Sequence, residues 1–438
     1  MIESKEDTTI SITEKPIQPK RRIKLLTFNT WGLKFVSKFR KDRLKAIANQ
    51  LANPTIDEDD YDIIALQEVW CEEDWEYLNK VCAIRYPYRR IFKSGIITGP
   101  GLSVLSKIPI SETFLYRFPI NGRASAFFRG DFFVGKSIAI TIIKPNDSIP
   151  IALLNSHMHA PYGSGDASYS THRAAQAWDF TKMVKMLKNA GYAVIQVGDL
   201  NSKPDSLPYR LFTIEGGLND SWNILHKENV IANEEIKNLS LLDQIKLAGV
   251  TCNSKLNSWR EMRPIHEACR LDYALIDDYN IKPIAASVKF VDKIPRINCS
   301  YSDHFAYAVE LEINDCFEAR DQGDIEEKLR VYRELLTEIK HYRNFTIPFQ
   351  AIWRKSYFIF SCVIVIGMHV AIVFVSNVAG WVSVLFLLFT SFIIITGLLN
   401  GLIWYMGVRS ESRALAEVQL EVEDAYNYLS KDINTQSG

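Results

Sequence analysis

The chain has 438 residues, of which 47% are hydrophobic and 23% are charged. These fractions are ordinary for folded proteins, so they exclude a disordered or collagen-like chain. The 51 basic and 51 acidic residues balance to a formal net charge of zero. That balance argues against a dedicated nucleic-acid binder, which usually carries a clear basic excess. The length exceeds one average domain, and a large sandwich domain with a membrane part would account for it.

Residues 1–22 are predicted to form a flexible N-terminal tail, because the first twenty are polar and lack an apolar core. For the same reason we expect no signal peptide. Seven cysteines are scattered along the chain without CxxC pairs or zinc-ligand spacing. We expect reduced thiols in a cytosolic environment rather than a disulfide framework.

Residues 23–314 predict an α/β domain, because short β-rich runs alternate with helical stretches. Polar clusters close several of the runs, and such folds place their active sites at strand ends. The predicted strands are 23–29, 62–68, 101–106, 137–144, 150–157, 193–201, 271–277 and 303–312, and predicted helices include 40–51, 72–82 and 171–190.

Residues 356–408 contain no Lys, Arg, Asp or Glu. One membrane helix needs ~20 apolar residues, so this segment predicts two helices, 357–376 and 379–405, joined by a tight turn. Arg354 precedes the segment and Arg409 follows it, whereas the turn is uncharged. The positive-inside rule therefore predicts a transmembrane hairpin with both ends in the cytosol. The alternative is a buried helical pair within a soluble core.

Amphipathic helices are predicted on both sides of the hairpin, one in the juxtamembrane linker 315–355 and one in the C-terminal segment 409–438. Each carries an apolar stripe with a spacing of three or four residues, which a partner helix would bury. Gly397 and Gly401 form a GxxxG step, which permits close helix approach. We predict that the two helices pack together beneath the α/β domain and form a homodimeric stalk. The alternatives are that the stripes simply cover that domain, or that stripes and glycines close a single chain on itself.

The polar clusters at strand ends contain the groups that hydrolysis of a phosphate ester requires. Mg²⁺ prefers hard oxygen ligands, and one or two carboxylates suffice, so Glu68 with help from Asn29 predicts a metal site. His304 can act as a general base if a carboxylate holds its other ring nitrogen, and both Asp272 and Asp303 are candidates. Donors for the phosphate oxygens are offered by Asn155, His157 and Asn201.

In chain order, the clusters read TFNTWG, LQEVW, NSHMH, GDLN, RLDYAL and SDH. This succession resembles the DNase I-like endonuclease/exonuclease/phosphatase superfamily. Within it, the chain is most similar to the neutral sphingomyelinases, especially the fungal inositol phosphosphingolipid phospholipases C. The resemblance extends over residues 23–406. It implies a DNase I-like four-layer α/β sandwich, with two β-sheets face to face and helices outside, followed by a two-helix transmembrane hairpin, so that residues 23–314 are the catalytic domain.

The resemblance also implies a role for each polar residue. Glu68 would be the principal Mg²⁺ ligand, with Asn29 and Asp303 near the metal, and Mn²⁺ could substitute for Mg²⁺. His304 would be the general base and Asp272 its partner, unless Asp303 orients it. Residues that orient the phosphate, stabilise its transition state, assist the leaving group or contact the substrate would be Asn155, His157, Asp199 and Asn201.

Residues 130–137 satisfy the pattern GxxxxGK[ST] of a nucleotide-binding P-loop. A true P-loop leads into a helix, whereas a β-rich run follows Lys136 here, so nucleotide binding is not expected. The resemblance implies instead that Asp131 and Lys136 form a regulatory switch at the active site. The alternative is an ordinary surface ion pair.

Residues 92–100 and the aromatic residues near position 130 are two further apolar groups. They could contact lipid near the mouth of the site, but buried strand side chains are the interpretation we favour. The aromatic residues are Phe127, Phe128, Phe132 and Phe133.

The sequence thus predicts a Mg²⁺-dependent phospholipase C that cleaves inositol phosphosphingolipids or sphingomyelin to ceramide and a phosphorylated head group. The resemblance implies activation by phosphatidylserine, cardiolipin or phosphatidylglycerol, and residence in the endoplasmic reticulum or the mitochondrial outer membrane. One alternative is a membrane-tethered phosphodiesterase or phosphatase acting on phosphoinositides or nucleic acid. A further alternative is a non-catalytic lipid sensor. Nucleic acid is not the expected partner, because a membrane substrate explains the hairpin.

Overall fold

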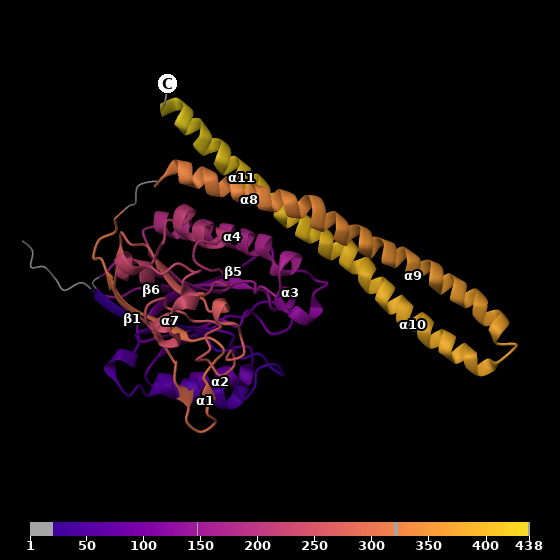
Figure 1. Cartoon of the computed structure of the whole chain (residues 1–438), viewed down its shortest axis with the longest axis horizontal. Helices are drawn as coiled ribbons and strands as arrows, with labels where there is room; N and C mark the ends of the chain where they lie inside the picture. The colour runs from indigo at the N-terminus through magenta and orange to yellow at the C-terminus, as the bar shows by residue number, and fades with distance from the viewer. Residues whose placement is uncertain (1–20, 147, 319–322, 437–438) are drawn as a thin grey trace, which may run out of the picture.

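The computed structural model describes residues 21–146, 148–318 and 323–436, so residues 1–20 of the predicted tail lie outside the described residues. Two six-stranded sheets pack face to face, with helices on both outer faces (Figure 1). Strand β1 begins at Arg21, so residues 21 and 22 belong to a sheet rather than to the tail.

The first sheet has the order β11 (Ile281–Lys289), β14 (Ala306–Ile313), β1 (Arg21–Asn29), β2 (Ile63–Gln67), β4 (Ser103–Ser106), β3 (Tyr88–Ile91). The second has the order β5 (Ile110–Arg117), β6 (Ser137–Ile143), β7 (Ile151–His157), β8 (Ala193–Asp199), β10 (Asp272–Ile276), β9 (Asn219–Asp220).

The central strands are buried on both faces, which is why their sequences read as continuous apolar runs. In β1, Leu25 faces the core between the sheets, whereas Leu26 and Phe28 face α1 (Arg40–Ala52) and α2 (Glu72–Val81). The outer face of the second sheet packs on α4 (Ser170–Asn189). The DNase I-like four-layer α/β sandwich is confirmed.

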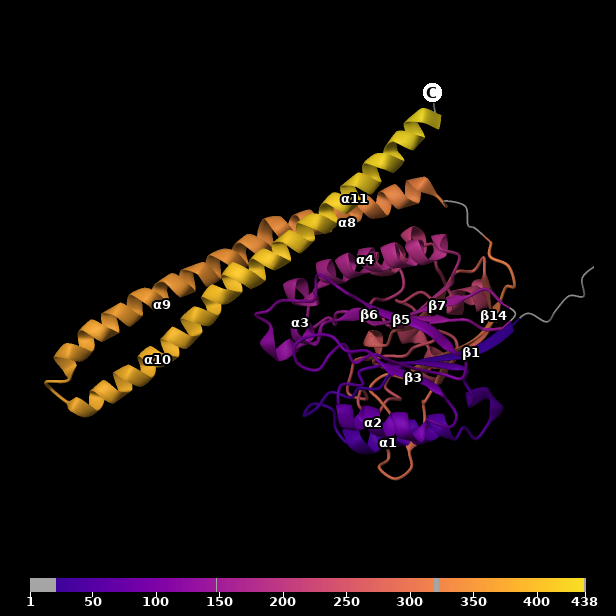
Figure 2. The ribbon, with the colours of Figure 1, turned by 180° about the vertical axis from the view of Figure 1, so that it is seen from behind.

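The C-terminal region consists of two long, nearly continuous helices that lie side by side (Figures 1 and 2). In the first, α8 (Ile325–His341) passes through a π-helical turn into α9 (Ile347–Val375). In the second, α10 (Gly380–Leu402) passes through a similar turn, 403–408, into α11 (Arg409–Gln436). The helices therefore continue through the predicted borders of the hairpin, residues 356 and 408, without a break.

The apolar stripes of α8 and α11 are buried together in one cluster with α4 of the sandwich. Leu336 and Ile339 of α8, Val418 and Val422 of α11 and Trp178 of α4 all belong to it. The stripes therefore contact each other and cover the α/β domain within one chain. The homodimer was predicted because the apolar stripes need a partner surface, and they find one within their own chain. The oligomeric state stays a prediction.

The side chains of α9 and α10 are mostly exposed and strongly apolar, so the alternative of a pair buried in a soluble core is wrong. Both helices are long and apolar enough to cross a membrane. Gly397 and Gly401 let them approach, because an added Cβ at Gly397 would lie 2.6 Å from the Cβ of Ser361. At Gly401 it would lie 2.8 Å from the ring of Phe358.

Gly397→Leu should therefore destabilise the hairpin, since overpacking of a close contact costs about 1–3 kcal/mol. We expect a lower thermal midpoint for α9 and α10 in detergent, followed by circular dichroism. Gly367→Leu is the matched control, because nothing lies within 4 Å of an added Cβ there. Equal midpoints for the two variants would contradict the proposed packing.

Candidate active site

The predicted polar residues meet at one edge of the sandwich, where the carboxyl ends of parallel strands come together. Strands β1 and β2 are parallel in the first sheet, and β7 and β8 are parallel in the second. Asn29, His157 and Asp199 are the last residues of β1, β7 and β8, and Glu68 directly follows β2. A cavity of about 850 Å³ opens at this edge. It is lined by Glu68, His157, Asp199, Asn201, Asp303 and His304, among others.

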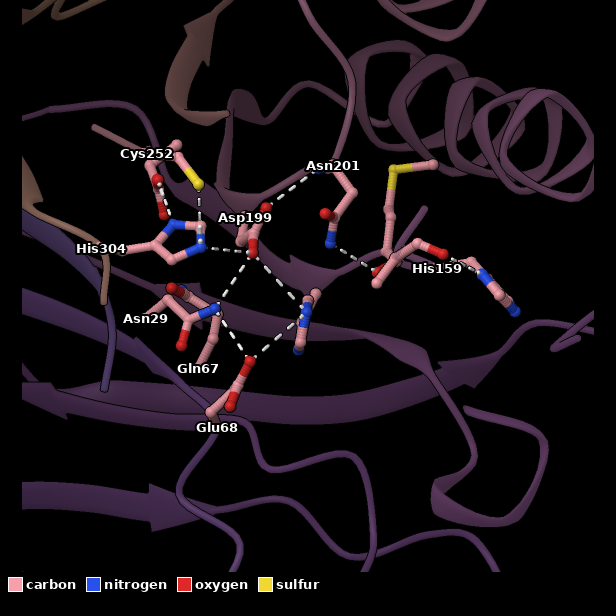
Figure 3. Close-up of polar contacts among 12 residues, drawn as sticks. Asn29, Gln67, Glu68, His159, Asp199, Asn201, Cys252 and His304 are labelled. Atoms are coloured by element: carbon pink, nitrogen blue, oxygen red, sulfur yellow. Dashed lines mark hydrogen bonds and ion pairs between the residues drawn. The ribbon is translucent and has the colours of Figure 1, made fainter. Parts of the chain in front are cut away.

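Asn29 joins two carboxylates from opposite sheets. Its Nδ2 donates to Oε1 of Glu68 at 3.1 Å and to Oδ2 of Asp199 at 3.0 Å (Figure 3). Its Oδ1 accepts from the backbone N–H of Trp31 at 3.0 Å. Asn29 therefore presents its NH₂ group to both carboxylates and holds them apart, and its predicted place near the metal stays a prediction.

His304 forms a dyad with Asp272 rather than with Asp303. Its Nδ1 lies 2.9 Å from Oδ2 of Asp272, and its Nε2 lies 3.7 Å from Oδ2 of Asp199. Asp303 instead forms an ion pair with Arg260. Between the two carboxylates that the sequence left open, the geometry places Asp272 behind the imidazole.

The pKa of His304 reflects this setting. Burial acts to lower the pKa of His304, but the neighbouring Cys252, Asp272 and Asp199 raise it well above its usual value. A hydrogen bond with Cys269, together with burial, raises the pKa of Cys252 itself, so Cys252 is a neutral thiol. The two carboxylates therefore favour the protonated form of His304, and a divalent cation that neutralises Asp199 would lower the pKa of His304 toward the range that a general base needs.

The donor set fits a cation. Burial raises the pKa of Glu68 to about 7, and the carboxylate of Asp303 adds to the shift. Burial likewise raises the pKa of Asp199 to about 6. A bound divalent cation would stabilise the charged forms of these crowded carboxylates. One oxygen each from Asp199 and Asp272 and one nitrogen of His304 also lie within 4.8 Å of one another, so acidic and histidine groups that could hold a metal ion are present.

His157 is a neutral donor within the same group. Its Nε2 lies 3.8 Å from Oε1 of Glu68 and 3.6 Å from Oδ2 of Asp199. Burial lowers the pKa of His157 well below its usual value, and the positive charge of Lys136 acts in the same direction. A neutral imidazole can donate a hydrogen bond, but it does not supply a proton at neutral pH.

Asn201 lines the cavity, and Asn155 does not. The Nδ2 of Asn201 donates to the carbonyl of Met158 at 3.0 Å. Asn155 accepts from Gln67 at 2.8 Å and donates to two backbone carbonyls of the first sheet at 3.1 and 3.2 Å. It lies two residues before His157 in β7, so it points the same way but deeper between the sheets. The structure places Asn155 as a link between the two sheets, and its predicted contact with substrate stays a prediction.

Lys136 and Asp131 form a buried ion pair next to the site. Nζ of Lys136 lies 3.2 Å from Oδ1 of Asp131 and donates to the carbonyl of Met158 at 3.0 Å. Asn201 donates to the same carbonyl, so the pair is joined to the cavity wall. Both side chains are buried, so the alternative of an ordinary surface ion pair is wrong. The short helix α3 (Asp131–Val134) precedes Lys136 and β6 follows it, so the helix that a P-loop requires after the lysine is missing.

The cavity also contains basic residues that the sequence reasoning missed. Arg260 holds Asp303, and Arg260 lies in an irregular segment between α7 (Leu241–Lys246) and β10. Neither a strand end nor a motif marks such positions, so no local signal could have found them. The other basic residues of the cavity wall are Arg173, Lys203 and Arg263.

Comparison with known proteins agrees with this geometry. Residues 26–304 match the sequence model of the Endonuclease/Exonuclease/phosphatase family, and the chain belongs to that family. The three activities in the family's description all break phosphate ester bonds, so the chain is a phosphoric ester hydrolase, and the cavity is its candidate active site.

Several relatives extend the match beyond that domain. The chain is 49% identical to "Inositol phosphosphingolipids phospholipase C" of Saccharomyces cerevisiae over 437 residues, which cover 93% of this chain and 91% of the relative. It is 34% identical to the Schizosaccharomyces pombe protein of that name over 414 residues, covering 92% and 94%. It is 27% identical to "Sphingomyelin phosphodiesterase 2" of Mus musculus over 363 residues, covering 79% and 81%. Because the two yeast proteins match more than nine-tenths of the chain, the likeness extends into the C-terminal helices.

Proposed function

We propose that the protein is a membrane-anchored, Mg²⁺-dependent phospholipase C that cleaves inositol phosphosphingolipids or sphingomyelin to ceramide and a phosphorylated head group. The observation that carries this proposal is the dyad of His304 and Asp272, which faces Glu68 and Asp199 across one cavity. The names of the relatives supply the substrate class, since two of them are 49% and 34% identical over more than nine-tenths of the chain.

The dyad provides the general base. His304 takes a proton from the attacking water at Nε2 while Asp272 holds Nδ1 and stabilises the imidazolium that results. The water oxygen bonds to phosphorus as the bond from phosphorus to the ceramide oxygen breaks. That oxygen takes a proton from solvent and leaves as ceramide, and His304 then releases its proton to solvent. Asp199 assists the leaving oxygen, and Asn201 and His157 donate hydrogen bonds to the phosphate. Glu68, with Asp199 and Asp303, would hold Mg²⁺ or Mn²⁺, which supplies Lewis-acid stabilisation of the phosphate charge.

The buried pair of Asp131 and Lys136 acts as the switch of this site. Because Lys136 and Asn201 share the Met158 carbonyl, movement of the pair would displace the cavity wall. Lys136→Ala should lower turnover by roughly 10²-fold or more through misplacement of Asn201, since small shifts of positioned groups carry such costs. Lys107→Ala, at a surface ion pair, is the control. Saturable ATP binding that depends on Lys136 would instead support the P-loop reading.

Membrane attachment follows from the hairpin, with both ends cytosolic. Arg354, Lys355, Arg409 and Arg413 would face the anionic leaflet, and each basic residue contributes about 1 kcal/mol near such a surface. We therefore include activation by phosphatidylserine, cardiolipin or phosphatidylglycerol in the proposal, with the endoplasmic reticulum or the mitochondrial outer membrane as the location.

One assay tests the function. The purified full-length protein in nanodiscs is offered inositol phosphoceramide, sphingomyelin, phosphatidylcholine and an abasic DNA duplex, with Mg²⁺ or with EDTA, in neutral and anionic discs. We expect ceramide from one or both sphingolipids, faster in anionic discs and abolished by EDTA. Cleavage of DNA alone, or of phosphatidylcholine at an equal rate, would overturn the substrate class.

A further inference from the structure

Two loops beside the active site expose large apolar side chains at their tips. Ile96 is 68% exposed and Ile97 is 64% exposed, while Phe127 is 61% exposed and Phe128 is fully exposed. We call these four residues the apolar tip. The interpretation of buried strand residues is wrong for all four, although the neighbouring Phe132 and Phe133 are partly buried.

The apolar tip has a defined shape because the two loops are joined to each other. The backbone N–H groups of Ile96 and Ile97 donate to the carbonyl of Phe133 at 2.7 and 3.4 Å. The ring of Phe127 lies 5.1 Å from that of Phe133. Gly95 adopts a φ of +75°, and an added Cβ there would lie 2.3 Å from the Val134 carbonyl, so the backbones are in direct contact.

The tip lies on the side of the domain from which the hairpin departs. Figures 1 and 2 both show α3, which directly follows Phe127 and Phe128, on the side toward which α9 and α10 extend. Gly407, at the end of the hairpin, is close enough to this region that an added Cβ would lie 3.2 Å from the Cβ of Ala124. A membrane that holds the hairpin would therefore face the tip.

The tip also adjoins the active-site cavity. Tyr162 lines the cavity, and its hydroxyl donates to the backbone carbonyl of Arg129 at 2.8 Å and to Asp131 at 2.9 Å. Arg129 ends the short helix that carries Phe127 and Phe128. The loop with Phe127 and Phe128 thus adjoins both the wall of the cavity and the base of the hairpin.

We propose that Ile96, Ile97, Phe127 and Phe128 insert into the leaflet that the hairpin enters, and so hold the catalytic domain against the bilayer with its cavity at the lipid surface. Phe and Ile at exposed loop tips are suited to the boundary between head groups and acyl chains. The docking requires only the hairpin in a bilayer. Its benefit for catalysis rests on the proposed lipid substrate.

The docking can be measured without any substrate. In a Cys71→Ser, Cys316→Ser, Cys362→Ser background, which leaves only buried native thiols, one cysteine at a time is introduced as Phe128→Cys or Ile84→Cys and labelled with bimane. Ile84 is the matched control because it is also fully exposed but precedes β3, whereas the loop with Ile96 follows the other end of that strand. The full-length protein is placed in nanodiscs with and without lipids brominated on the acyl chains.

We expect blue-shifted emission at position 128 that brominated lipid quenches, and neither effect at position 84. Equal behaviour at the two positions would overturn the proposal. Shielding at 128 without quenching would also overturn it, since a second copy or another protein would then cover the tip.

Catalysis offers an independent readout. Phe127→Ser with Phe128→Ser should lower turnover of sphingolipid in bilayers by about tenfold, but leave hydrolysis of a short-chain, monomeric analogue unchanged. Equal losses on both substrates would indicate a damaged site rather than lost docking. If the wild type cleaves neither substrate while bimane at 128 is quenched, the proposed function fails and the docking stands.

Discussion

His304→Ala is expected to lower turnover by roughly 10²- to 10⁴-fold, the range that general acid–base catalysis contributes. The imidazole is the one group of the cavity that combines a carboxylate 2.9 Å behind Nδ1 with an Nε2 directed at the site. The measurement is the initial rate on sphingolipid in nanodiscs at saturating Mg²⁺. His266→Ala, at an exposed position, is the control and should retain full activity.

The same experiment separates the two candidate partners of His304. Asp272→Asn should cost nearly as much as His304→Ala, because an amide cannot stabilise the imidazolium. Asp303→Asn should instead weaken metal binding, since Asp303 lies near Glu68 and pairs with Arg260. A larger rate loss for Asp303→Asn than for Asp272→Asn at saturating metal would contradict the assignment of the dyad. Binding of a lipid analogue should survive in all three variants.

Glu68→Gln is expected to weaken divalent metal binding by more than about 100-fold and to abolish turnover, because an amide is a poor ligand for a hard cation. Glu68 follows β2 in a left-handed conformation, with φ of +60°, and its carboxylate lies beside Nε2 of His157, as does that of Asp199. The measurement is Mn²⁺ titration by electron paramagnetic resonance, with Glu72→Gln as an exposed control from the start of α2.

The affinity for metal should also rise with pH. The pKa of Glu68 is raised to about 7 and that of Asp199 to about 6, so below those values protons occupy the carboxylates and compete with the cation. For each proton that the metal displaces, the affinity for metal should therefore fall by up to about tenfold per pH unit between pH 8 and pH 5.5. The steep part of this dependence should disappear in Glu68→Gln. Affinity independent of pH in the wild type would place the metal elsewhere.

The sequence alone was enough for the architecture and for the groups that gather at the site. Strands buried on both faces read as apolar runs, as in 151–157 and 193–199, so their burial is visible locally. The absence of charge in 356–408 likewise marks the hairpin without reference to any other part of the chain. The weakly patterned strands β5 and β11 were missed, because half-exposed residues at the sheet edges lack that signal.

Only the tertiary structure decided which of these groups are partners. Asp303 is adjacent to His304 in sequence, yet it forms an ion pair with Arg260. Asp272, the first residue of β10 in the other sheet, holds the imidazole instead. Asn155 and His157 lie on the same face of β7. Asn155 lies deeper between the sheets and links them, whereas His157 reaches the cavity.

The same holds for the apolar groups. Phe128 and Phe133 are the same residue type only five positions apart, yet Phe128 is fully exposed and Phe133 is partly buried. By their sequence, the apolar stripes of α8 and α11 could be buried by a partner chain or within their own chain. The structure packs them against α4 of the same chain. The physical reason is that periodicity and side-chain type report burial along a short segment. Which atoms meet depends on sheet register, strand depth and loops that are distant in sequence.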